Sequence, residues 1–131
     1  MSRKAIRTGA LVLLIAGLGL GEASSQTVQT LRVMREKLAR AERLLGDVVT
    51  SDWTALDRDA MALEELTNDP AWSVLLLPEY ARGSDAFLRA LQDLKDAAAR
   101  RDPEATPLAY VSLTLSCVRC HQDVARARLA R

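Results

Sequence analysis

The sequence contains very little of what several functional classes require. It has one histidine and two cysteines in 131 residues, too few for a structural zinc site, which needs four ligands. Its 18 basic and 17 acidic residues nearly balance, so the chain lacks the positive field of a nucleic-acid-binding protein. The neighbouring carboxylates at positions 57, 59, 64 and 65 are expected on a solvent-exposed helix face. Because the sequence shows no nucleophile or acid–base pair suited to catalysis, we do not expect this protein to be an enzyme.

A long hydrophobic run is also missing. Residues 9–21 are apolar and uncharged, but a membrane-spanning helix needs about 20 such residues. Basic residues precede this run at positions 3, 4 and 7, and Gly21 and Ala23 stand just before a plausible cleavage site at Ser24. This pattern is typical of a secretory signal peptide over residues 1–23, which leaves a mature domain of residues 24–131 without a stable membrane span. Retention of the segment as an N-terminal anchor is the alternative.

Strand-like alternation is absent, and helical periodicity dominates the rest of the chain. Residues 27–49 are expected to form an amphipathic helix. A second helix begins after Ser51 or Asp52, either of which can cap it, and ends before Pro70. The inward positions of the first helix are predicted to be Leu31, Met34, Leu38, Ala41, Leu45 and Val48, and those of the second Trp53, Leu56, Ala60, Leu63 and Leu66.

Two further helices complete the predicted fold. Ser84 is expected to cap the third, and residues 102–104 to open the fourth, which runs to about Leu129. Residues 70–83 are irregular but too apolar for a free linker, so this connection is expected to pack over the core. The predicted inward residues are Phe87, Leu91, Leu94 and Ala98, then Leu108, Val111, Leu115 and Val118. The fold class is therefore an all-α, antiparallel four-helix bundle.

Both cysteines and the only histidine fall within the run Cys117-Val118-Arg119-Cys120-His121. Helical residues three or four apart share a face, so both cysteines can form thioethers with the two vinyl groups along one edge of a haem. His121 is then held beneath the iron as an axial ligand. Cys-x-x-Cys-His is the attachment motif of c-type haem, and histidine often ligates haem iron. The sequence thus predicts one covalent haem c, with its iron, on the C-terminal helix.

Other uses of these residues fit less well. A disulfide between Cys117 and Cys120 would close too short a loop to stabilise the fold much. A thioredoxin-type redox motif belongs in a βαβ context, and the sequence has no strand pattern. A zinc site would lack its fourth ligand, because there is no second cluster of cysteine or histidine.

A short four-helix chain with a signal peptide and Cys-x-x-Cys-His on its last helix resembles the cytochrome c-prime family, in particular its six-coordinate, low-spin members. The resemblance covers the architecture of residues 24–131, and in specific residues it rests on Cys117, Cys120 and His121. It implies an electron carrier or a gas-binding haem protein of the bacterial periplasm. Family members often carry an aromatic residue and an arginine at the third and fourth positions after the histidine. This chain has Val124 and Ala125 there, with an arginine one place later.

The second axial ligand decides between these two functions. Met34 and Met61 are the methionines outside the signal segment. His121 lies eight residues before the expected end of the fourth helix, and Met34 seven after the expected start of the first. At about 1.5 Å per residue, both reach nearly the same level of antiparallel helices. We expect Met34 as the distal ligand. The alternatives are Met61, an iron without a second protein ligand, or a Met34 that merely packs in the core.

Further side chains are candidates for the surroundings of the haem. Arg32 and Arg35 lie beside the expected methionine ligand, and a guanidinium pairs well with a propionate, although a solvated helix face explains both equally well. Trp72 is expected to anchor the core or the loop. Tyr110, two turns before the first cysteine, is expected to line the haem edge or to pack in the core.

The expected function is one-electron transfer in the periplasm by a His/Met-ligated haem that exchanges electrons with a redox partner protein. Methionine ligation raises the reduction potential, and a saturated iron leaves no site for a substrate. A homodimer is compatible with this interpretation. The alternative function is NO or CO binding by a five-coordinate haem. A haem-free bundle with a disulfide is the third hypothesis.

Overall fold

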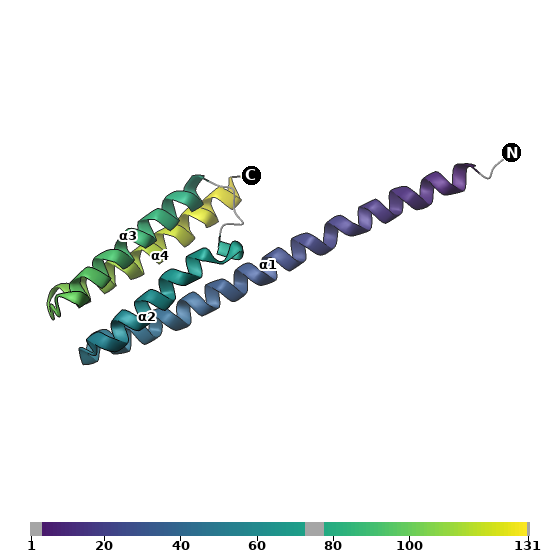
Figure 1. Cartoon of the computed structure of the whole chain (residues 1–131). Helices are drawn as coiled ribbons and strands as arrows, with labels where there is room; N and C mark the ends of the chain where they lie inside the picture. Colours follow the sequence, from purple (N-terminus) through teal and green to yellow (C-terminus); the bar gives the residue numbers. More distant parts are fainter. Residues whose placement is uncertain (1–3, 73–77, 131) are drawn as a thin grey trace.

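The computed structural model is helical throughout the part that it describes, which is the backbone of residues 4–72 and 78–130 and the side chains of residues 25–72, 78–127, 129 and 130. Its helices are α1 (Lys4–Thr50), α2 (Trp53–Glu65), α3 (Pro78–Ala99) and α4 (Ala105–Leu129), with short 3₁₀ turns η1 (Leu66–Asn68) and η2 (Pro70–Trp72) after α2. α1 pairs with α2, and α3 with α4, as two antiparallel hairpins (Figure 1). The predicted all-helical bundle is confirmed. The expected signal segment lies outside the described side chains. No described helix is long and apolar enough to cross a membrane.

Both hairpin turns are built in the same way. Ser51 and Arg101 follow the ends of α1 and α3 in the left-handed region, with φ of 54° and 52°. Their N–H groups, and those of the next residues, bond back to carbonyls in the last turn of the preceding helix at distances of 2.8–3.2 Å, which is a Schellman motif. Asp52 and Asp102 then accept a bond from an N–H in the first turn of the next helix, at 3.0 and 2.9 Å. Of the two residues predicted as possible caps of the second helix, Asp52 is the one that caps it, and Asp102 lies at the predicted opening of the fourth.

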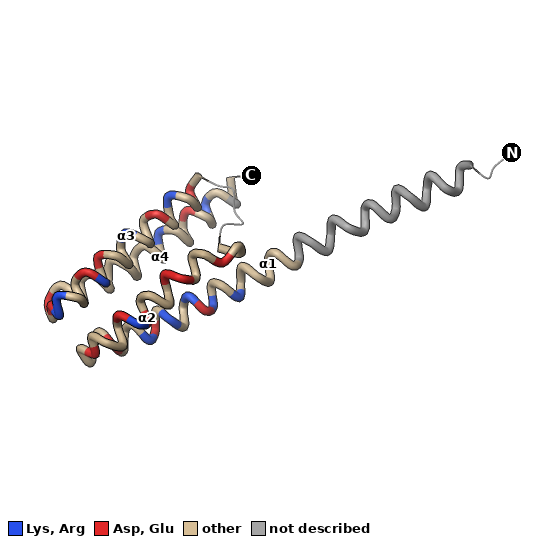
Figure 2. Tube along the Cα trace, in the orientation of Figure 1, with Lys and Arg blue, Asp and Glu red and all other residues tan. Residues whose placement is uncertain are grey.

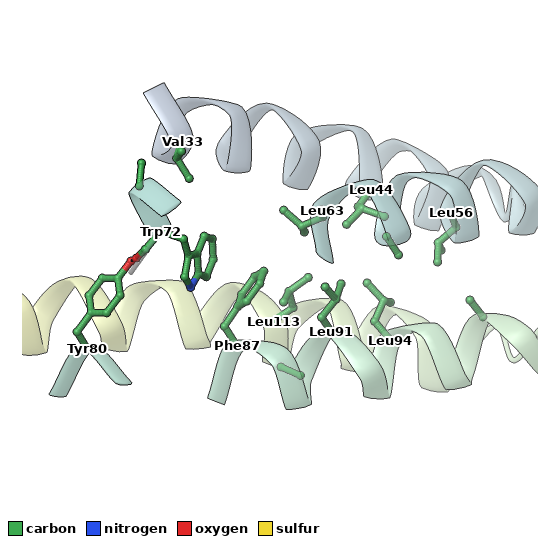
Figure 3. Packing of buried hydrophobic residues seen from close by; sticks show 14 residues of the cluster. Val33, Leu44, Leu56, Leu63, Trp72, Tyr80, Phe87, Leu91, Leu94 and Leu113 are labelled. Atoms are coloured by element: carbon green, nitrogen blue, oxygen red, sulfur yellow. The ribbon is translucent and has the colours of Figure 1, made fainter. Parts of the chain in front are cut away.

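The core lies between the two hairpins (Figure 3). It is centred on buried leucines and on Phe87, whose ring is tilted by 44° against that of Trp72 at a centroid distance of 5.3 Å. The inward residues predicted for α2 and α3 that the structure buries are Leu56, Ala60, Leu63, Phe87, Leu91, Leu94 and Ala98. These two faces were correctly predicted, because each helix carries only one apolar stripe.

α1 turns a different face to the core than predicted. Leu31, Leu38 and Leu45 are exposed, whereas Val33 and Leu44 are fully buried. The helix carries apolar residues on two adjacent faces, and periodicity identifies an apolar face without showing what covers it. The inward face is therefore rotated relative to the predicted one.

The inward face of α4 also differs from the predicted one, because this helix too carries apolar residues on more than one face. Its first fourteen residues, 105–118, carry no charge (Figure 2), so the pattern alone does not choose between faces. Leu113 is buried, together with the small residues Thr106 and Ser116. The predicted inward residues are exposed: Leu108, Val111, Leu115 and Val118.

α3 begins at Pro78, six residues before the predicted start at Ser84. Proline is favourable in the first turn of a helix, where its missing N–H would have no partner. Gly83 suggested a break but lies inside the helix, close to α4. Trp72, at the end of η2, is buried, so the described part of the connection packs on the core as predicted; residues 73–77 lie outside the described residues.

Candidate functional site

A cavity of about 500 Å³ lies between α1 and α4, and η2 and the first turns of α3 close its sides. Its lining is largely apolar and includes Leu31, Trp72, Tyr80, Val124 and Leu129. Cofactor sites typically occupy 300–1,000 Å³ and combine an apolar wall with a few polar groups. The cavity has the size and character of such a site.

The four residues predicted as haem contacts all line this cavity. Met34 comes from α1, and Cys117, Cys120 and His121 come from successive turns of α4. Met34 and the cysteines are half-buried, and His121 is exposed. Both cysteines are free thiols. Met34 precedes Cys117 by more than 80 residues in the sequence. The fold therefore brings its thioether to the same cavity as the two thiols and the imidazole.

Tyr110 fixes the level of α4 relative to α1. Its hydroxyl donates a hydrogen bond to the carbonyl oxygen of Ala41 at 2.9 Å. Met34 on α1 and Cys117 on α4 each lie seven residues from this bond, and both line the cavity together with Cys120 and His121. The prediction that Met34 and His121 lie at nearly the same level counted from a helix start near residue 27, whereas α1 continues through this position.

Cys120 packs against the backbone of α3 at Gly83. A Cβ atom on Gly83 would lie 2.7 Å from Cys120 Sγ and 3.1 Å from its Cβ, so a larger residue would force the Cys120 side chain or the helix to shift. Burial raises the pKa of the Cys120 thiol, while the nearby Lys37 ammonium acts in the opposite direction. The thiol is therefore protonated at neutral pH.

Lys37 also lines the cavity and was not among the predicted site residues. Its Nζ lies 3.8 Å from the ring centroid of Phe87 and 4.4 Å from that of Trp72, which is cation–π geometry. Burial lowers the pKa of its ammonium, and the two cysteines raise it to a lesser extent. The position could have been found from its spacing, because Lys37 follows Met34 by one turn and a charged residue there interrupts an apolar face.

Three other candidate residues lie elsewhere. Arg32 forms a salt bridge with Asp69 at 2.6 Å. Arg35 is exposed and does not line the cavity. Met61, the alternative methionine ligand, is 55% exposed on α2 and lines a separate shallow groove. Of the two methionines, Met34 is the one that the fold places at the motif.

The remaining predictions are resolved by specific contacts. Tyr110 is engaged with α1, as described above, rather than lining the cavity. Trp72 is a core anchor, as predicted, and also forms part of the cavity wall. Arg126, one place after the position at which the family often has an arginine, pairs with Asp123 at 2.7 Å. The carboxylate of Glu64 pairs with Lys95 at 2.6 Å, so it is a structural ion-pair partner.

Comparisons of the chain with protein families, with curated proteins and with solved structures find no match. Among the described residues, no group of three or more histidine, cysteine, aspartate or glutamate side chains is placed to hold a metal ion directly.

Proposed function

We propose that this chain is a monohaem c-type cytochrome, similar to the cytochrome c-prime family, that is exported by the segment 1–23 and carries one electron at a time between protein partners in the periplasm. Cys117 and Cys120 would hold the haem through thioethers. His121 would be its proximal iron ligand and Met34 its distal one. The observation that carries this proposal is that these four residues, from two helices, line one apolar cavity.

The chemistry of the donor set fits a haem. A porphyrin supplies the equatorial ligands of its iron, so the protein needs to supply only axial ones, and imidazole and thioether are common choices. The two thiols are free and share the cavity with both donors. The rest of the wall is largely apolar, as a macrocycle requires. Two of the neighbouring carboxylates on α2, those of Asp59 and Glu64, are engaged in ion pairs outside the cavity.

The chain's own residues would tune electron transfer at this site. When bound, the haem supplies an iron that changes its charge by one unit. The apolar side chains of Leu31, Trp72 and Val124 would shield a bound haem from water on their side of the cavity, which would strengthen the electrostatic interactions there. The Lys37 ammonium disfavours an additional positive charge nearby and so favours the reduced state. His121 is exposed, which leaves this side of the cavity open to an electron-transfer partner.

One observation favours the second candidate function, gas binding at a five-coordinate iron. The part of the cavity wall that comes from α1 and η2 is largely apolar and includes Leu31 and Trp72. If Met34 does not ligate the iron, this apolar space would suit NO or CO. The two candidates share the covalent attachment and differ only in the sixth ligand.

Attachment is tested by expressing the full chain together with haem-attachment machinery. We expect the purified protein to be coloured and its mass to correspond to one haem on a chain that begins near Ser24. The haem should resist acid–acetone extraction. Cys117→Ser and Cys120→Ser should each leave a single thioether and mature poorly, whereas Ser112→Ala, at an exposed position of the same helix, should mature normally. A colourless protein, or an extractable haem, would contradict the proposal.

A further inference from the structure

A buried acidic residue lies where α2 packs against α1, outside the candidate site. Asp59 was expected on a solvent-exposed face of α2, but it is only 7% exposed and is the one charged residue that is buried among those described. Arg58 donates two hydrogen bonds to its carboxylate, at 3.3 and 3.2 Å, and Nε of Arg43 on α1 lies 3.9 Å from its Oδ2. Because a buried charge needs such partners, Asp59 is held in its ionised form.

A second carboxyl group reaches Asp59 from the last turn of α1. The backbone carbonyl of Asp47 accepts the N–H of Asp52 at 2.9 Å in the turn between the helices, and the Asp47 side chain is in hydrogen-bond contact with the Asp59 carboxylate. Oδ2 of Asp47 has almost no accessible surface, and no donor within the described part of the chain reaches it. The environment of Asp47 thus lacks what an ionised carboxylate requires.

Two carboxylates accept hydrogen bonds only, so the contact between these two groups requires a proton on one of them. Asp47 is the group that carries it. The hydrogen bond from Arg58 holds the pKa of Asp59 below its ordinary value of 3.8, whereas burial and the charge of Asp59 raise the pKa of Asp47 above that value. Asp47 also lies near the C-terminal end of α1, where the helix dipole disfavours a negative charge.

The balance of charge around the pair leads to the same assignment. The charged groups that act most strongly on it are Arg43 on α1, Arg58 on α2 and Asp52 in the turn, and none of them belongs to α3 or α4. Three carboxylates and two guanidiniums would leave one uncompensated negative charge, which a single proton neutralises. A metal ion fits less well, because the guanidiniums already flank Asp59 and no described group of acidic, cysteine or histidine side chains is placed to hold one.

We propose that Asp47 and Asp59 share one proton and form a pH-sensitive latch between the end of α1 and the middle of α2. In the closed latch, the O–H of Asp47 donates to the carboxylate of Asp59. When the pH rises and the proton is lost, two like charges are left in contact and repel each other. When the pH falls and a second proton binds, Asp59 loses the charge that the two arginines hold. The inference does not depend on the proposed function.

The latch therefore contributes most to stability in a window of pH around 3.8, the ordinary value for both aspartates. Above this value, the raised pKa of Asp47 means that the folded chain binds more protons there than the unfolded one, so its contribution decreases as the pH rises. Below it, the lowered pKa of Asp59 has the opposite sign, and its contribution decreases as the pH falls. α1 contacts α2 more extensively than it contacts α4, so the latch acts on the main support of the helix that carries Met34.

The test is urea unfolding of the purified product of the full chain at a series of pH values. Asp47→Asn keeps a donor to Asp59 but cannot ionise. We expect the variant and the wild type to be similarly stable near the window. As the pH rises, the variant should become the more stable one, by roughly tenfold in the equilibrium constant of unfolding for each unit by which the pKa of Asp47 is raised. Asp57→Asn, at an exposed position of α2, is the matched control and should follow the wild type.

Infrared spectroscopy provides a second measurement. The carbonyl band of a protonated carboxyl group should persist in the wild type to a higher pH than that of ordinary aspartates, and Asp47→Asn should remove this component. The proposal would be overturned if the stability curves stay parallel or already diverge at the ordinary pKa of 3.8, since removal of a negative charge from the helix end would explain the latter. A wild type that calcium ions stabilise at neutral pH, with no such effect in Asp47→Asn, would instead assign the pair to a cation.

Discussion

The hydroxyl of Tyr110 on α4 donates a hydrogen bond to the backbone carbonyl of Ala41 on α1, at 2.9 Å. These two helices contact each other less extensively than α1 contacts α2 or α3 contacts α4, and the bond joins the C-terminal part of α1 to the second turn of α4. It joins the two helices that carry Met34 and the cysteines. One polar contact thus helps to hold together the two sides of the candidate site.

Tyr110→Phe should lower the free energy of unfolding by about 1 kcal/mol, the usual net value of a hydrogen bond that is half-buried. The carbonyl of Ala41 belongs to the backbone of α1, which the substitution does not alter. The decrease in the free energy of unfolding should therefore not exceed about 1 kcal/mol. Urea denaturation of the haem-free chain measures it. Tyr80→Phe is an informative comparison, because the Tyr80 hydroxyl also donates to a backbone carbonyl, that of Trp72, but does not join α1 to α4. A Tyr110→Phe chain as stable as the wild type would show that packing alone sets the register.

Met34→Ala distinguishes the two proposed functions. If Met34 ligates the iron, the oxidised wild type should show a weak sulfur-to-iron band at the red end of the visible spectrum. The variant should then become high-spin, bind carbon monoxide rapidly and have a lower reduction potential, because the soft thioether favours ferrous iron. Met61→Ala should change little, since that residue is remote from the cavity. A wild type that is already high-spin and binds carbon monoxide freely would make gas binding the better assignment.

Gly83→Ala should destabilise the protein and impair the arrangement around Cys120. The new methyl group would lie 2.7 Å from the sulfur, so the Cys120 side chain must rotate or α3 and α4 must move apart, at a cost on the order of 1–3 kcal/mol. Gly46→Ala is the control. It lies within α1, where a Cβ would meet nothing within 4 Å, and should stabilise the helix by about 0.5–1 kcal/mol. Thermal unfolding of both variants measures the contrast, and equal shifts would contradict the contact between Gly83 and Cys120.

Lys37→Met should change how stability depends on pH. The folded protein lowers the pKa of Lys37 through burial, so above this lowered pKa the unfolded chain binds more protons than the folded one. The stability of the wild type should therefore rise with pH, up to the ordinary lysine pKa of 10.5. Relative to Lys37→Met, the haem-free wild type should gain stability as the pH increases, measured by urea unfolding at several pH values. Lys95→Met, which removes a surface ion-pair partner of Glu64, serves as the comparison. Parallel curves for Lys37→Met and the wild type would rule out the buried ammonium.

The parts of the fold that could be predicted are those in which a single sequence pattern determines the structure. α2 and α3 each have a single apolar stripe, and their buried residues follow from spacing; Asp52 and Asp102 cap as their positions suggest. α1 and α4 could not be oriented, because Leu38 and Val33, or Val111 and Leu113, are equally apolar and only the partner helix decides between them. The residues of the candidate site were found because rare residue types cluster at the motif. Lys37 was missed because a lysine at an inward position looks like part of a solvated face until the rings of Trp72 and Phe87 are placed around it.

The contact between Gly83 and Cys120 has a consequence for biogenesis. On the proposed function, a thioether must form at a sulfur atom against which α3 packs in the folded bundle. The enzyme that joins vinyl group to thiol needs room on that side, and it would find this room only while α3 is still undocked. Attachment would then come before the last step of folding, with the exported chain held open until its second thioether is made. The first turns of α3, from Pro78 to Gly83, would then be the last part of the molecule to dock.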